Sequence, residues 1–65
     1  MNDTIKETAA QILSFVQSHK SVTAWQIKIE LRIKSSLLYL SLGVLVADGK
    51  IKLEESGTDY TVTTL

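Results

Sequence analysis

Few residues of this chain have the types and spacing that catalysis or metal binding requires. Its 65 residues include one histidine, His19, and no cysteine, and the carboxylates are scattered. These residues supply no nucleophile–base pair and no spacing typical of metal ligands. The three glycines, Gly43, Gly49 and Gly57, do not form a phosphate-binding loop. The sequence therefore predicts a protein that is not an enzyme and that has no metal site, no cofactor and no small-molecule ligand.

Positive charge is the other candidate for chemistry, because lysine and arginine side chains contact phosphates. The net charge is zero, but residues 20–52 hold six of the seven basic residues. Residues 53–65 hold three acidic residues and no basic one. The middle of the chain is therefore basic and its end acidic, which falls short of the strongly basic balance of a dedicated nucleic-acid binder.

Length and hydropathy limit the organisation of the chain. A chain of 65 residues can bury only a thin core, so we expect one domain over residues 1–65. Its apolar runs are shorter than the roughly 20 residues that span a bilayer. The first residues lack the basic start of a secretory signal. The expectation is a cytoplasmic protein without a membrane segment.

Two helices are predicted in the first half of the chain. Thr4 and Glu7 fit a capping box, followed by an apolar stripe at helical spacing that comprises Ile5, Ala9, Ile12, Leu13 and Val16. His19 is then expected to be exposed in the last turn, where positive charge suits the helix dipole. Thr23 and Gln26 fit a second capping box. The second helix presents its apolar residues on two opposite sides, with Ala24, Ile27 and Leu31 on one and Trp25 and Ile29 on the other.

The stretch 35–49 organises the rest of the chain. Three leucines recur at i, i+4 and i+7, which predicts a helix that ends at Asp48-Gly49, because glycine tolerates the left-handed conformation found there. A second apolar set lies on nearly the opposite side, and no charged residue occurs between Lys34 and Asp48. Such a helix is either buried on several sides or carries an interface. The two sets are Leu38, Leu42 and Leu45, and Leu37, Leu40, Val44 and Ala47.

The remaining segments favour short strands. Residues 50–54 and 60–63 alternate polar and apolar side chains, which is typical of half-buried strands. Residues 55–59 have the composition of a turn, so the two strands are expected to form an antiparallel hairpin. The break at Ser21–Thr23 has room for one further short strand. Residues 32–35 are expected to form a tight turn into the third helix, with Ser35 as candidate cap because Lys34 occupies the usual capping position.

This order of elements resembles a winged helix-turn-helix domain. The family typically shows a capping threonine, a leucine ending the second helix, an isoleucine in the turn, apolar residues in the third helix, a closing Asp-Gly-x-Ile and an apolar returning strand. The matching residues are Thr23, Leu31, Ile33, Leu38, Leu42, Leu45, Asp48, Gly49, Ile51, Tyr60 and Val62. The chain is similar to small stand-alone winged-helix domains of uncharacterised bacterial proteins. The resemblance implies an α+β fold of three helices with a C-terminal two-stranded hairpin, the wing.

The resemblance implies a DNA-associated module of the transcription-regulator type, since the third helix of such domains commonly enters the major groove. Base readout needs Arg, Lys, Asn or Gln on the outer side of that helix, where this sequence offers only Ser36 and Tyr39. A rim of cations could contact phosphates without reading bases, although a solvated basic surface explains the same residues. The candidate nucleic-acid-binding residues are Lys28, Arg32, Lys34, Ser36, Tyr39, Lys50 and Lys52.

The alternative function is a winged helix used for protein interaction or self-association. Its candidate patch comprises Trp25, Ile29, Leu37, Leu40 and Val44, because exposed apolar area on a small domain marks partner binding. A structural explanation stays open for most of the same residues. The hairpin, the first helix and the C-terminal residues would cover Leu37, Leu40 and Val44, and Trp25 would cover the end of the first helix. The expected partners are DNA, bound weakly or without specificity, or a protein, including a second copy of the chain.

Overall fold

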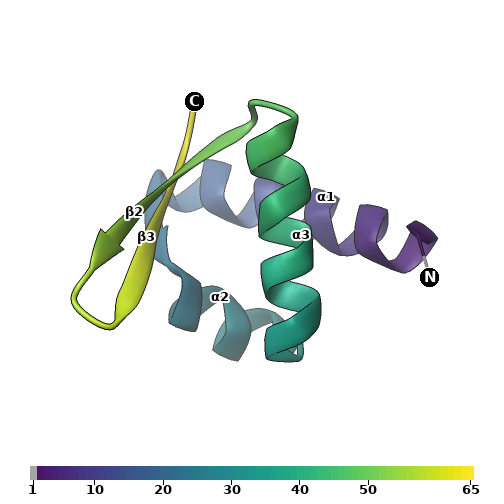
Figure 1. The fold of residues 1–65 in the computed structure, drawn as a ribbon, viewed down its shortest axis with the longest axis horizontal. Coiled ribbons are helices and arrows are strands. Elements are labelled where there is room, and N and C mark those ends of the chain that lie inside the picture. Colours follow the sequence, from purple (N-terminus) through teal and green to yellow (C-terminus); the bar gives the residue numbers. More distant parts are fainter. Residues whose placement is uncertain (1) are drawn as a thin grey trace.

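The computed structural model describes residues 2–65 of the chain (Figure 1). Within these residues the elements follow one another as α1, β1, α2, α3, β2 and β3. The helices are α1 (Asn2–His19), α2 (Ala24–Leu31) and α3 (Ser35–Ala47). The strands are β1 (Ser21–Thr23), β2 (Ile51–Ser56) and β3 (Asp59–Thr64). The protein is therefore α+β, with three helices and a three-stranded sheet over the residues described. The three helices and the hairpin are as predicted, and the third strand, which the sequence left open, is present.

The sheet is antiparallel and has the strand order β1-β3-β2. Its central residue is Val62, which is paired with Val22 of β1 and with Leu53 of β2. The short strand predicted at Ser21–Thr23 therefore forms, and it pairs with the returning strand of the hairpin. Figure 1 shows the hairpin extending along one side of the helices.

The hairpin turn is shorter than the sequence predicted. Residues 55 and 56 continue β2, and Ser56 pairs with Asp59, so only Gly57 and Thr58 form the loop. Gly57 adopts a positive φ of 65°, which two-residue hairpin turns favour because it matches the twist of the strands. The predicted five-residue turn at 55–59 is therefore wrong, because three of its residues belong to the strands.

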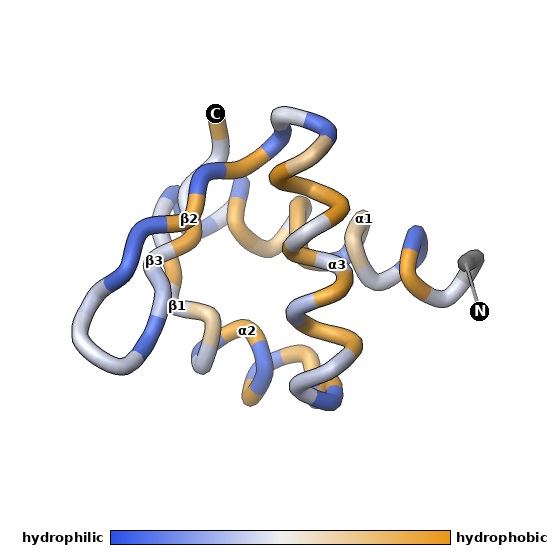
Figure 2. Tube along the Cα trace, in the orientation of Figure 1, coloured by the Kyte–Doolittle hydropathy of each residue, from blue (hydrophilic) through white to orange (hydrophobic). Residues whose placement is uncertain are grey.

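One face of every helix contributes to a single core. Figure 2 shows apolar stretches on all three helices and in the strands. The predicted stripe of α1 is confirmed, since Ala9, Ile12 and Val16 are buried and Ile5 and Leu13 are half-buried. The buried apolar residues are Ala9, Ile12, Val16, Val22, Ala24, Ile27, Leu38, Leu42, Leu45, Ile51 and Val62.

The start of α1 differs from the sequence prediction. Thr4 lies inside the helix, because the helical conformation begins at Asn2. Thr4 is therefore not its N-cap, and the capping box with Glu7 is wrong. A capping pattern indicates where a helix can begin, and the boundary shifts when the preceding residues also adopt helical geometry.

The start of α2 is capped twice. Thr23 has extended geometry, and its hydroxyl accepts a hydrogen bond from the N–H of Gln26 at 3.1 Å. This confirms Thr23 as the N-cap, whereas the described residues show no return bond from the Gln26 side chain, so only half of the predicted capping box forms. Asp59, at the start of β3, accepts a longer bond of 3.4 Å from the N–H of Trp25 and one of 2.8 Å from that of Tyr60. A carboxylate at a helix N-terminus is favourable. Asp59 therefore connects the hairpin to α2.

The turn between α2 and α3 contains a residue in left-handed conformation. Arg32 has φ 53° and ψ 51°, a geometry that usually belongs to glycine or asparagine. Lys34 has the extended geometry of an N-cap, without a hydrogen bond from its side chain, and Ser35 is the first helical residue. The candidate cap Ser35 is therefore wrong, because a capping residue must lie outside the helix.

The end of α3 has the predicted geometry. Gly49 adopts φ 70°, and its N–H donates to the carbonyl of Val46 at 3.0 Å. The N–H of Lys50 donates to the carbonyl of Leu45 at 2.9 Å. These two bonds form a Schellman motif, which directs the chain from α3 into β2.

Candidate functional site

The side of α3 that faces away from the core carries no charge. We define the α3 outer face by the exposed helix positions from Ser36 to Ala47, which lie opposite the buried leucines or on the flank beside them. All of its side chains are uncharged, so no point on it offers the cationic groups that read bases or contact phosphates. The α3 outer face consists of Ser36, Tyr39, Leu40, Gly43, Val44, Val46 and Ala47.

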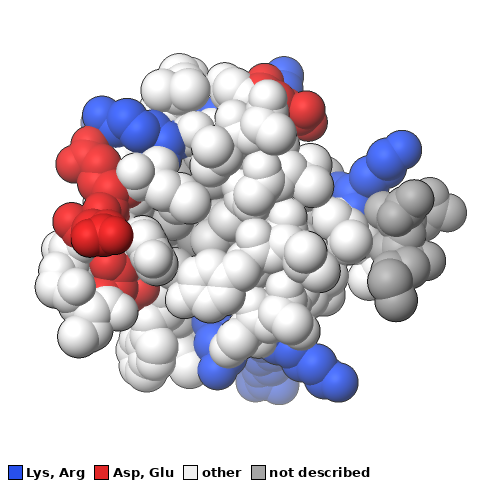
Figure 3. Space-filling view, viewed as in Figure 1, with Lys and Arg blue, Asp and Glu red and all other residues white. Residues whose placement is uncertain are grey.

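Tyr60 of β3 extends this surface towards the hairpin. Its ring meets that of Tyr39 edge to face, with centroids 6.3 Å apart. Both residues remain partly exposed. We call the α3 outer face together with Tyr60 the α3–β3 surface. Figure 3 shows it as an uncharged centre over α3, with acidic and basic side chains around its edges.

The elements around α3 explain why its outer face stays uncovered. Figure 1 shows α1 passing behind α3 and the hairpin lying to one side of it. Leu40 is 56% exposed and Val44 is also exposed, so the idea that other elements of the described chain cover them is wrong. Leu37 is half-buried. It lines a hollow of about 300 Å³ with Thr4, Ile5, Ser36 and Leu40.

Trp25 is also exposed, at 64% of its surface. It does not cover the end of α1, as one interpretation of the sequence had it. Because it lies at the start of α2, it lines a hollow of about 260 Å³ shared with α3 and the hairpin turn. Ile29 is exposed on α2 but does not line this hollow. The residues that line it are Trp25, Lys28, Ser35, Leu38, Tyr39, Thr58 and Asp59.

The candidate cations fall into two groups. Lys28, Arg32 and Lys34 belong to α2 and the α2–α3 turn, at the start of α3. Lys50 and Lys52 follow its end. A helix of 13 residues is about 20 Å long, so the structure separates the two groups by roughly the length of α3. Ser36 and Tyr39 lie between them on the exposed side of the helix.

One of the second group is already paired. The ammonium of Lys52 contacts a carboxylate oxygen of Glu54 at 2.8 Å. The hydrogen bond and the opposite charge raise the pKa of Lys52 and lower that of Glu54. Glu55 and Asp59 add further negative charge to the hairpin, which would repel a phosphate backbone.

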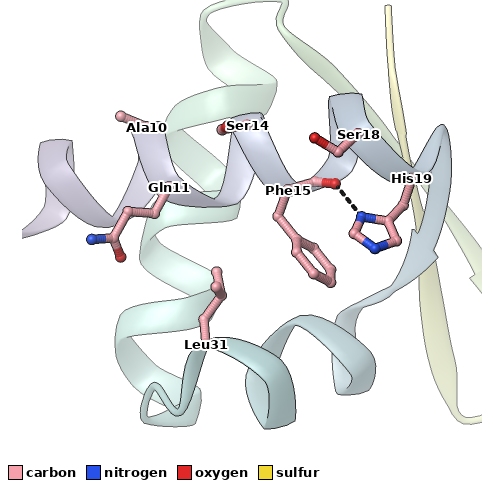
Figure 4. Close-up of a pocket in the computed structure, with 7 residues that line it drawn as sticks. All are labelled: Ala10, Gln11, Ser14, Phe15, Ser18, His19 and Leu31. Atoms are coloured by element: carbon pink, nitrogen blue, oxygen red, sulfur yellow. Dashed lines mark hydrogen bonds between the residues drawn. The ribbon is translucent and has the colours of Figure 1, made fainter.

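His19 lies in a different place, at a hollow of about 570 Å³ between α1 and α2 (Figure 4). Its Nδ1 lies 2.8 Å from the carbonyl oxygen of Phe15, and the two rings are 4.2 Å apart. Phe15 and Leu31 point into this hollow from the two helices (Figure 4). The ring is thus held as a helix-end group, as the sequence suggested. No cluster of metal-ligating side chains occurs among the described residues.

Sequence reasoning did not include Tyr60 or Val46 in a candidate site. Alternation along β3 places Tyr60 on the same side as Val62, which is buried. The core does not reach the hairpin end of that strand, so Tyr60 contacts Tyr39 and stays partly exposed. The helical period of α3 could have found Val46, since it follows Tyr39 by seven residues and therefore lies on the same side of the helix.

No protein-family model, curated protein or solved structure matches the chain. Between residues 2 and 65, none of the helices combines the length and apolarity that crossing a bilayer demands.

Proposed function

We propose that this chain is a non-catalytic, winged-helix-like module that binds another protein through the α3–β3 surface. The layout supports the first part of the proposal: α2 and α3 are joined by a short turn, and a hairpin follows at once. This is the element order of a winged helix-turn-helix domain. In that family α3 corresponds to the helix that meets the ligand, so its outer face is the place to look for function.

The observation that carries the proposal is the absence of charge across all seven positions of the α3 outer face. Contiguous exposed apolar area on a small domain marks an interaction site. Aromatic residues at such a site, here Tyr39, Tyr60 and nearby Trp25, supply large contact areas at low entropic cost. A protein partner benefits from these side chains, whereas a DNA groove offers them little.

A photo-crosslinking amino acid at position 40, introduced in the organism that encodes the chain, tests the proposal. The expected result is a covalent adduct with a protein. The same substitution at Gln17, an exposed residue of α1 outside the surface, is the matched control and should give no such adduct. Adducts with nucleic acid, or equal adducts at both positions, would contradict a protein-binding role.

DNA association is the second candidate, and the group formed by Lys28, Arg32 and Lys34 favours it. Three phosphate contacts predict a slope of about −3 in a plot of log K against log salt concentration. Because the outer face lacks base-reading groups, we expect weak binding that depends little on sequence. Titrating several duplexes at a series of salt concentrations measures both properties. Nanomolar binding to one sequence, lost on single-base changes, would replace the protein-binding proposal with a DNA-reading one.

A further inference from the structure

We infer that the partner of the α3–β3 surface is a second copy of the same chain, which pairs with it about a two-fold axis. This inference rests on the proposed function and specifies which protein binds the α3–β3 surface. It follows from the charges that border the uncharged surface, because these charges are of opposite sign on two neighbouring edges.

The basic edge consists of Lys28, Arg32 and Lys34, at the end of α2 and in the turn to α3. Figure 3 shows basic side chains gathered along the lower border of the uncharged surface, where Figure 1 places this turn. Among the side chains that the structure describes, those of residues 4–65, none of the three forms an ion pair. Lys28 and Arg32 are four residues apart, a spacing at which like charges repel each other. An anionic surface facing this edge would relieve that repulsion.

The acidic edge consists of Glu54, Glu55 and Asp59 on the hairpin. Figure 3 shows acidic side chains along the left border of the same surface. Glu54 contacts Lys52, while Glu55 and Asp59 have no ion-pair partner within the described chain. The two edges therefore carry three residues each and opposite charge, and both adjoin the α3–β3 surface.

A two-fold axis that lies across the surface, along the diagonal between its left and lower borders, exchanges these two edges. Facing copies related by this axis place each basic edge against the acidic edge of the partner. The attraction then occurs twice, as an isologous interface requires, and the uncharged centres meet between the edges. A DNA partner would be repelled by the acidic edge, so charge complementarity favours a partner that carries both signs in this arrangement.

An interface of standard size would take only a minor part of the molecular surface. The described chain exposes 4454 Å², and a standard interface takes about 800 Å² from each partner. The dimer would thus bury about a fifth of the surface of each copy. An uncharged centre of aromatic and aliphatic side chains inside a charged rim is the usual anatomy of an interface of this size.

Charge reversal at one residue of each edge tests the inference. Lys34→Glu places a carboxylate in the basic edge, and Glu55→Lys places an ammonium group in the acidic edge. Each variant leaves the other edge of its chain unchanged. Sedimentation equilibrium of the wild-type chain should show a monomer–dimer equilibrium. Each variant alone should dimerise about tenfold more weakly, because two reversed contacts occur in each pair. An equimolar mixture of the two variants should regain affinity. Each mixed pair keeps one unaltered contact between a basic and an acidic edge, and in the other contact the two reversed residues carry opposite charges.

Lys6→Glu and Glu7→Lys on α1 are the matched controls, because these exposed residues belong to neither edge. They should dimerise as the wild-type chain does, alone and mixed. Circular dichroism establishes that all four variants are folded. Raising the salt concentration should weaken the wild-type dimer as well, which provides a readout that needs no substitution.

A wild-type chain that stays monomeric up to millimolar concentration would overturn the inference. A dimer that is indifferent to Lys34→Glu and Glu55→Lys, or a mixture that fails to recover affinity, would do the same. Crosslinking at position 40 separates this failure from that of the proposed function. An adduct with a different protein keeps the proposed function and rejects the second copy, whereas no protein adduct together with a monomeric chain rejects both.

Discussion

Leu42 and Leu40 lie two residues apart on α3, and they differ in exposure from 1% to 56%. Leu42 points into the core with Leu38 and Leu45, whereas Leu40 lies on a face that no element of the described chain covers. Both sides of α3 lack charge, and both carry leucine. The difference teaches that the residue types of a helix face do not determine its burial, since neighbouring elements decide which face is covered.

The largest expected effect on stability comes from a substitution on the buried side of α3. We expect Leu42→Ala to lower the free energy of unfolding by about 2–5 kcal/mol, because it removes buried methyl groups and leaves a cavity. Chemical denaturation followed by circular dichroism measures the change. Leu40→Ala is the matched control and should change it by less than about 0.5 kcal/mol. Equal losses at the two positions would mean that the two sides of α3 are equally buried.

The next largest effect on stability is expected at Gly49, which follows the end of α3. Gly49 has φ 70°, a conformation that a Cβ-bearing residue adopts at a cost of about 1–2 kcal/mol. Gly49→Val should therefore lower the melting temperature. Open space surrounds the position of a Cβ there, so the loss reports backbone conformation and not steric conflict. An unchanged melting temperature would contradict the left-handed geometry.

A smaller effect, a gain in stability, is expected from a second substitution on the buried side of α3. Ser41 is fully buried, and its hydroxyl has no hydrogen-bond partner among the described residues. Ser41→Ala should therefore raise stability by about 1 kcal/mol, because an unpaired buried hydroxyl is destabilising. Thermal denaturation measures the gain. Gly43→Ala on the outer face is the comparison variant. Its gain in stability should be similar in size, but it comes from helix propensity alone, because open space surrounds the added methyl group. A loss at Ser41 would show that its hydroxyl is hydrogen-bonded.

The smallest effect on folding is expected at Leu40→Arg. An exposed position should change stability by less than about 0.5 kcal/mol. This variant should associate more weakly than the wild-type chain, because the interface would bury an unpaired charge. Sedimentation and denaturation of the same sample separate the two quantities. If Leu40→Arg binds DNA more tightly and with a steeper salt slope, the outer face contacts DNA instead, and if it unfolds the chain, Leu40 belongs to the core.

Much of the fold was predictable, because it depends on local patterns. The helical period located the buried apolar residues of α1 and α3, although it did not indicate that Thr8 and Ser41 are also buried. Asp48-Gly49 located the end of α3. Capping was predictable at Thr23 and was wrong at Thr4 and Ser35. The failures share a cause: a serine or threonine can cap only when the backbone around it leaves the helix, and its own identity does not decide this.

The candidate site was less predictable, because its properties depend on residues distant in sequence. Periodicity placed Leu40 and Val44 opposite the core leucines, but it left open whether another element covers them. The composition of residues 55–59 indicated a turn. In the structure Asp59 starts β3 and accepts a hydrogen bond from Trp25, which is 34 residues away. The sequence analysis treated the candidate cations as one set. The structure divides them into two groups at opposite ends of α3.

The sequence by itself thus determined the secondary elements, their order and one buried side for each helix, since spacing and capping act over a few residues. Only the tertiary structure decided that α1 and the hairpin leave the outer face of α3 exposed, and that Tyr60 joins it through Tyr39. It also decided which charges border that face. Periodicity specifies which side chains share a face, and packing between distant segments specifies what the face meets.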